Sequence, residues 1–201
     1  MRNKVIFIDR DGVINKDPGG WTEYSYVTRW GDFHFLDGAL EALNLLKKHG
    51  FKVIIISNQA GVGKKFFSRE DLDRVTVKML EAIHKHGGEI ENIYYCMHKK
   101  EDNCNCRKPK TGMLEDAIKL YEAKPHETYF VGDSIVDIEA GVKLGLETIF
   151  VLSGKTSLEE SRKWNVKPNH IFKNLLEAVR WIAVKEKRKT ERAFKRKMRG
   201  D

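Results

Sequence analysis

Near its start the chain carries the stretch Val5-Ile6-Phe7-Ile8-Asp9-Arg10-Asp11-Gly12. Four apolar residues, three of them β-branched, predict a short buried strand. Asp9 and Asp11 follow that strand directly, and ligands of open α/β sheets sit beyond the carboxyl ends of the strands. There one carboxylate can attack or hold a metal while the other carries a proton. A polar turn without function would also fit, so the later strands have to supply matching chemistry.

Strands and helices are expected to alternate along the chain. The expected strands cover 5–8, 52–56, 90–96, 128–131 and 147–152, with a short sixth at 171–172, and the expected helices cover 37–49, 68–86, 111–122, 135–144 and the residues from 175 onward. This alternation predicts an α/β fold, a Rossmann-like three-layer sandwich with a mostly parallel sheet. We expect one domain over residues 1–184 and a basic C-terminal tail over residues 185–201.

The net charge of +8 lies mostly in the tail. Residues 185–201 hold nine Lys and Arg against three Asp and Glu, a net +6, which leaves +2 for residues 1–184. Such a tail could bind nucleic acid, but Phe194 is its one aromatic residue and offers little stacking, so a solvated helix end is favoured. No signal-peptide pattern and no membrane-spanning apolar run is evident, so we expect a cytoplasmic protein. We also expect it to be a monomer.

Four expected strands end in polar, charged or ligating residues. Besides Asp9 and Asp11 these are Ser57 and Asn58 after the second strand, Cys96 and His98 with Arg107 and Lys108 after the third, and Asp133, Ser134 and Asp137 after the fourth. Acids gathered at one edge repel one another unless a cation binds, and oxygen ligands favour Mg²⁺. A carboxylate nucleophile, a metal, a lysine and a hydroxyl together make a phosphoryl-transfer set.

The three cysteines and one histidine form a second candidate site. Cys96-Met97-His98 is followed after five residues by Cys104-Asn105-Cys106, and two short Cys/His pairs joined by a loop suit tetrahedral Zn²⁺. Four protein ligands leave no open position, so the zinc would be structural and would fix the loop that carries Arg107 and Lys108. Three reduced cysteines in a polar loop are the alternative.

Residues 15–36 form a long connection beside the first strand. It contains six aromatic residues: Trp21, Tyr24, Tyr26, Trp30, Phe33 and Phe35. A loop of this length next to a candidate site is commonly functional, for instance as a lid, yet the same aromatic residues could pack a satellite core. Both interpretations stay open at this point.

The stretch Gly61-Val62-Gly63-Lys64 is superficially similar to a nucleotide-binding P-loop. That motif requires glycine at position 58 and serine or threonine at position 65. The chain has Asn58 and Lys65 there, so we reject a P-loop.

Taken together, Asp9-x-Asp11, Ser57, Lys108 and Gly132-Asp133-x-x-x-Asp137 resemble the four motifs of the haloacid dehalogenase-like phosphatases. The resemblance implies that Asp9 forms an aspartyl-phosphate and that Asp11 protonates the leaving alcohol and then activates water. It implies that Asp133, the Asp9 carboxylate and the Asp11 backbone carbonyl hold Mg²⁺. Ser57 and Lys108 would bind the transferring phosphoryl group, with Asn58, Arg107 and Ser134 as further candidates for phosphate or substrate. Asp137 would bind metal through water or orient its loop.

The cysteine cluster resembles one subgroup of these phosphatases, which acts on heptose bisphosphate or histidinol phosphate and generally lacks a large cap domain. Its residues here are Cys96-x-His98 and Cys104-x-Cys106-Arg107-Lys108-Pro109. We expect D-glycero-D-manno-heptose 1,7-bisphosphate, cleaved at C7, with Arg107 reading the second phosphate. Histidinol phosphate is the alternative, with Asp17 and Glu23 binding its amine. A polynucleotide 3′-phosphatase and a zinc-stabilised binding module without catalysis are less favoured.

Overall fold

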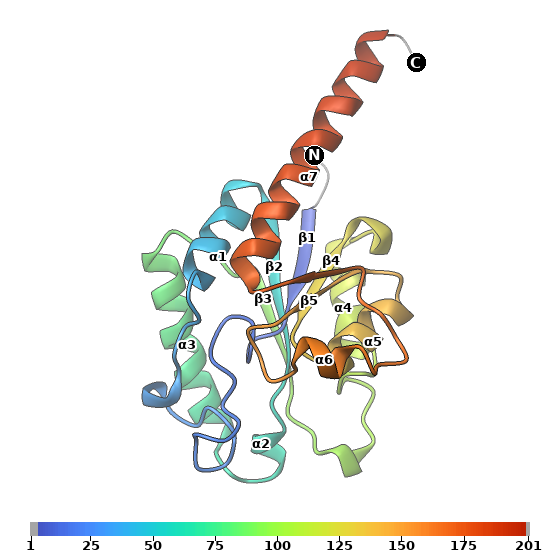
Figure 1. The fold of residues 1–201 in the computed structure, drawn as a ribbon. Coiled ribbons are helices and arrows are strands. Elements are labelled where there is room, and N and C mark those ends of the chain that lie inside the picture. Colours follow the sequence, from blue (N-terminus) through green and yellow to red (C-terminus); the bar gives the residue numbers. More distant parts are fainter. Residues whose placement is uncertain (1–3, 200–201) are drawn as a thin grey trace.

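The computed structural model describes the backbone of residues 4–199 and the side chains of residues 4–189, 191 and 198 (Figure 1). Its centre is a parallel sheet in the order β3-β2-β1-β4-β5-β6. The strands are β1 (Lys4–Ile8), β2 (Phe51–Asn58), β3 (Asn92–Cys96), β4 (Tyr129–Gly132), β5 (Glu147–Val151) and β6 (His170–Phe172). The expected strands and the parallel α/β class are confirmed.

Helices cover both faces of the sheet, as the three-layer prediction requires. They are α1 (Ala39–Lys48), α2 (Ala60–Gly63), α3 (Arg69–Lys85), α4 (Gly112–Tyr121), α5 (Ile135–Lys143), α6 (Leu158–Ser161) and α7 (Leu175–Arg199). Helices α1, α3 and α7 contribute to the core on one face, and α4 and α5 to the core on the other (Figure 1). The sequence did not predict α2 and α6, because a single turn is too short to show helical periodicity.

Strand β1 divides its side chains between the two cores. Ile6 and Ile8 lie in the core with α1, α3 and α7, whereas Val5 and Phe7 lie in the core with α4 and α5. Each of the four is at most 1 % exposed. A strand buried on both faces is apolar at every position, and this is why the first strand could be recognised as an unbroken apolar run.

The loop over residues 15–36 has two parts, one packed in the core and one facing the cavity. Its second half packs the core, because Val27 and Phe33 are buried and Trp30 stacks on Phe33 with a centroid distance of 5.2 Å. Its first half turns toward the carboxyl edge of the sheet, where Asp17 and Tyr24 help to line a cavity. The loop is therefore anchored at one end and faces the candidate site at the other.

Helix α7 runs from the sheet into the basic tail without a break (Figure 1). The helix is held by polar contacts at the amino ends of β4 and β5, where Lys185 pairs with Glu147 and the Tyr129 hydroxyl donates to Glu186 at 3.2 Å. The expected division into a domain over residues 1–184 and a tail stays a prediction. Within residues 4–199, no helix combines the length and the apolar character needed to cross a membrane.

Candidate active site

The carboxyl ends of β1, β2 and β4 meet at a cavity of about 460 Å³. It is lined by all eight residues expected to act in catalysis, phosphate binding or magnesium binding: Asp9, Asp11, Ser57, Asn58, Arg107, Lys108, Asp133 and Ser134. They converge because each lies at the carboxyl end of a strand of the same parallel sheet or, for Arg107 and Lys108, in the loop after β3.

Lys108 is the central cation of this site. Its Nζ atom lies 3.0 Å from Oδ2 of Asp9 and 2.6 Å from Oδ1 of Asp137, and it donates to the Ile56 carbonyl at 2.8 Å. Lys108 is buried, and burial alone would lower its pKa, but Asp137 and Asp9 raise the pKa of Lys108 to about 12. The lysine is therefore a fixed positive charge beside the Asp9 carboxylate.

Three carboxylates form a group that fits a divalent cation. Asp9, Asp133 and Asp137 each offer an oxygen, and these oxygens lie within 4.8 Å of one another. Burial raises the pKa of Asp9 to about 6, with Asp137 and Asp11 adding to the rise and Lys108 opposing it. Burial, Asp137 and Asp9 raise the pKa of Asp133 to about 8. Carboxylates crowded together in this way bind protons unless a hard cation neutralises their charge in place of the protons.

Two glycines let these carboxylates approach. Gly12 has a φ of +81°, and a Cβ atom built on it would lie 2.5 Å from Oδ2 of Asp133. A Cβ atom on Gly132 would lie 2.2 Å from Cβ of Asp137. Both distances are far inside van der Waals contact, so a larger residue at either position would push an acid away from the site.

The Asp11 carboxylate lies outside the metal-ligating group and is held by neighbouring side chains. Arg10 Nη2 donates to both of its oxygens at 2.9 Å, Asn15 donates to Oδ1 at 2.8 Å, and Gln59 donates to Oδ2 at 2.8 Å. Arg10 is fully buried, and Asp11 neutralises its charge. These contacts position Asp11 beside Asp9 at the cavity wall.

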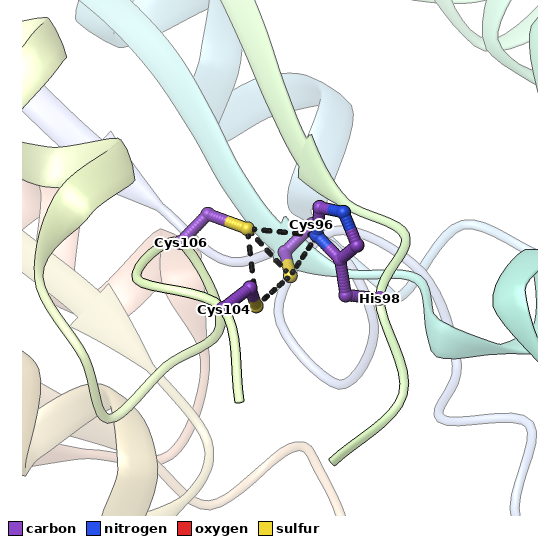
Figure 2. A group of neighbouring side chains, drawn as sticks. All are labelled: Cys96, His98, Cys104 and Cys106. Atoms are coloured by element: carbon purple, nitrogen blue, oxygen red, sulfur yellow. Dashed lines mark hydrogen bonds between the residues drawn. The ribbon is translucent and has the colours of Figure 1, made fainter. Parts of the chain in front are cut away.

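The cysteine cluster comes together as the spacing predicted (Figure 2). The three sulfur atoms of Cys96, Cys104 and Cys106 lie 3.0–3.6 Å apart, and Nδ1 of His98 lies 3.2 Å from the Cys106 sulfur. Ligands of tetrahedral zinc with Zn–S bonds of about 2.3 Å are separated by about 3.8 Å. The three cysteines are unpaired thiols, so the group could hold zinc with little movement.

Known proteins resemble this chain over most of its length. The HAD-hydrolase-like family model matches residues 105–178. The D-glycero-beta-D-manno-heptose-1,7-bisphosphate 7-phosphatase of Neisseria meningitidis serogroup A is 38% identical over 181 residues, covering 89% of this chain and 94% of that protein. The Pasteurella multocida protein of the same name is 34% identical, covering 89% and 96%. The chain belongs to the HAD-like phosphatases.

A solved structure of one HAD-like phosphatase supports the same assignment. The D,D-heptose 1,7-bisphosphate phosphatase of B. bronchiseptica, complexed with magnesium and phosphate, superimposes with a TM-score of 0.84 at 27% identity. The alignment covers 90% of this chain and 99% of that chain. The predicted family, fold and hydrolase class are thus confirmed.

Two of the residues expected to touch phosphate, Asn58 and Ser134, line the cavity and also make contacts within the protein. Asn58 accepts from the Lys108 backbone N–H at 3.0 Å and donates to the Lys108 carbonyl at 3.1 Å. The Ser134 hydroxyl donates to Oδ2 of Asp137 at 2.5 Å. Both side chains thereby fix the lysine and the acid of this HAD-like site, whereas Ser57 keeps its hydroxyl at the cavity wall and accepts from Gln59.

The cavity is also lined by residues that the sequence did not predict as site residues. Lys155 lines it after β5, and its backbone N–H donates to Oδ2 of Asp133 at 3.0 Å. Lys64, Tyr26 and Phe66 line it from α2 and the neighbouring loops. No motif marks these positions, although the lysine after the fifth strand follows the same strand-end pattern as Asp133.

We predict that Mg²⁺ stabilises the protein more at about pH 8.5 than at about pH 6. The raised pKa values of Asp9 and Asp133 mean that the metal-free folded protein holds extra protons at low pH. These bound protons stabilise the folded state relative to the unfolded chain. This stabilisation is lost as the pH rises through about 6 for Asp9 and about 8 for Asp133, and a cation can then take the place of the protons. Thermal melts at one fixed Mg²⁺ concentration measure the effect, with Asp133→Asn as the metal-site control. An equal or larger rise in Tm at the lower pH would contradict the prediction.

We also predict one zinc ion per chain, measured by elemental analysis of freshly purified protein. Cys104→Ser should lower both the zinc content and the Tm, because it removes one of the four expected ligands and metal binding contributes to folding stability. Activity should fall as well, although no cysteine takes part in the chemistry, because Arg107 and Lys108 directly follow the expected ligand Cys106. Asn105→Ser, an exposed change in the same loop, is the matched control. Protein that contains no zinc, or an unchanged Tm in Cys104→Ser, would refute the site.

Proposed function

We propose that the protein is a Mg²⁺-dependent phosphatase that removes the C7 phosphate of D-glycero-D-manno-heptose 1,7-bisphosphate. The observation that carries the proposal is the pairing of the Asp9 carboxylate with the buried Lys108 ammonium, 3.0 Å apart, at the carboxyl end of β1. Curated relatives at 34–38% identity are named for this reaction, and the B. bronchiseptica enzyme was crystallised with magnesium and phosphate.

Asp9 is the proposed nucleophile. One oxygen accepts from the Arg10 N–H at 2.7 Å and the other faces Lys108, so the carboxylate is held still beside the cavity. Its attack on phosphorus forms an acyl phosphate on Asp9 while the bond from phosphorus to the C7 oxygen breaks, and the electron pair of that bond leaves with the C7 oxygen. Lys108 and the Ser57 hydroxyl bind the oxygens of the transferring group. Mg²⁺, held by Asp9, Asp133 and the Asp11 carbonyl, would supply positive charge that shields the incoming phosphate.

Asp11 is the proposed acid and base. In its protonated form it gives a proton to the departing C7 oxygen, and as a carboxylate it later takes one from the water that hydrolyses the Asp9–phosphate. Each turnover therefore restores the Asp9 carboxylate and the protonated Asp11. Asp137, the third acid within 4.8 Å, contacts Lys108 and the Ser134 hydroxyl. We propose that Asp137 positions the lysine and completes the metal site.

Arg107 is the proposed reader of the second phosphate. It lines the cavity, its Nη1 atom is buried, and no described side chain or backbone group accepts from that atom. A planar guanidinium with free donors suits a phosphate. Histidinol phosphate would instead need acids near its amine. Asp17 does line the cavity, but its Oδ1 accepts from the Gly19 N–H, and Glu23 is not among the lining residues.

Product analysis tests the proposal. ³¹P NMR of the heptose bisphosphate with enzyme and Mg²⁺ should show loss of the C7 phosphate signal and retention of the C1 phosphate. Loss of the C1 phosphate, or no phosphate release, would overturn it. A cytoplasmic location and a monomeric state stay predictions.

A further inference from the structure

Lys64 stands at the cavity on a firmly placed turn. The short helix α2 (Ala60–Gly63) ends at this residue, and the Lys64 N–H donates to the Ala60 carbonyl at 2.9 Å. The Gly63 N–H donates to the Met97 carbonyl at 3.0 Å, and a Cβ atom on Gly63 would lie 2.4 Å from that oxygen. The turn is therefore packed against the start of the loop over residues 97–108, called the zinc loop because it carries three of the four expected zinc ligands. This packing fixes the backbone position of Lys64.

Aromatic rings support the Lys64 side chain without neutralising it. Its Nζ atom lies 5.8 Å from the ring centroid of Tyr26 and 5.9 Å from that of Phe66. Tyr24 stacks on Phe66 with a centroid distance of 4.9 Å and an interplanar angle of 9°. Rings attract an ammonium through their π faces but leave its full charge in place. Among the described side chains, no carboxylate lies within 4.0 Å of the Lys64 ammonium, so its charge is available to a ligand.

The scissile phosphate already has its own partners, Lys108 and Ser57, at the end of the cavity beside Asp9. A further uncompensated lysine on the wall of the same cavity indicates a second anionic group on the substrate. We propose that Lys64 binds the phosphate remote from the reacting one, with the Tyr24–Phe66 pair forming the wall beside the sugar. The proposal rests on the sugar bisphosphate function above and makes Lys64 a specificity residue, acting together with Arg107 from the zinc loop.

Product inhibition isolates this contact, because heptose 1-phosphate carries the remote phosphate alone. Lys64→Gln should raise the inhibition constant of heptose 1-phosphate and the KM of the bisphosphate about tenfold, as loss of a charge-assisted hydrogen bond implies. The inhibition constant of inorganic phosphate, which occupies the reacting site, should not change, and neither should kcat. Lys64→Arg should keep most of the affinity. Lys65→Gln, an exposed neighbour that does not line the cavity, is the matched control.

The outcomes separate this proposal from the function on which it rests. Inhibition of the wild type by heptose 1-phosphate, with the same constant in Lys64→Gln, would overturn the role of Lys64 alone. No inhibition of the wild type and no turnover of the bisphosphate would overturn both. A rise in the inorganic phosphate constant as large as that for heptose 1-phosphate would show a general disturbance of the site and would also contradict the proposal.

Discussion

Asp9→Asn is expected to abolish phosphate release, with kcat falling by at least about 10⁴-fold, the order seen when a catalytic nucleophile is removed. An amide oxygen is a poor nucleophile, so the Asp9–phosphate cannot form. The fold should remain, because burial raises the pKa of Asp9 to about 6 and the site therefore already tolerates an uncharged group there. Phosphate release under saturating Mg²⁺ and substrate measures the effect.

A matched control separates loss of the nucleophile from loss of charge or fold. Asp73→Asn removes a carboxylate that is 61% exposed on α3, and it should leave kcat unchanged. The Tm of Asp9→Asn, measured alongside, should stay close to that of the wild type. Substantial activity in a folded Asp9→Asn protein would disprove the covalent mechanism.

Asp11→Asn is expected to lower kcat by about 10²–10⁴-fold, the usual contribution of a positioned acid–base group. An aryl phosphate should separate its two roles, because a phenolate leaves without being protonated. With such a substrate the variant should release one phenol per chain in a burst and then turn over slowly, since the Asp9–phosphate forms but no base activates water. Activity within tenfold of the wild type, or no burst, would argue against the assignment.

This variant also has a structural consequence. Arg10 is fully buried, and Asp11 is its carboxylate partner. Removing one member of a buried pair leaves an uncompensated charge, which is strongly destabilising. We therefore expect a lower Tm for Asp11→Asn, and its kinetics should be measured well below that temperature.

The catalytic edge could be predicted because its residues sit at fixed places relative to strands. Asp9, Ser57 and Asp133 each end or directly follow an apolar run, and parallel strands bring such positions together whatever the loops do. The zinc group could be predicted for a similar reason, since Cys96-x-His98 and Cys104-x-Cys106 are local in the sequence and need only one loop to close.

Other parts of the site depend on tertiary contacts that leave no local pattern. Arg10 looks like a surface residue in sequence, yet it is buried because Asp11 neutralises it. Lys64 follows a single helical turn, and its place at the cavity depends on the Gly63 contact with the zinc loop. The motif Gly132-Asp133-x-x-x-Asp137 placed Asp137 at the site, but its ion pair with Lys108, which lies on the loop after β3, has no signal in the sequence.

The central claim is that the site is built for a sugar bisphosphate, and a side-by-side measurement of kcat/KM tests it most directly. Wild-type protein, loaded with zinc and assayed with Mg²⁺, would be given D-glycero-D-manno-heptose 1,7-bisphosphate and histidinol phosphate. We predict that the heptose bisphosphate is preferred by at least about tenfold, equivalent to about 1.4 kcal/mol of barrier. A preference of the same size for histidinol phosphate would contradict the account.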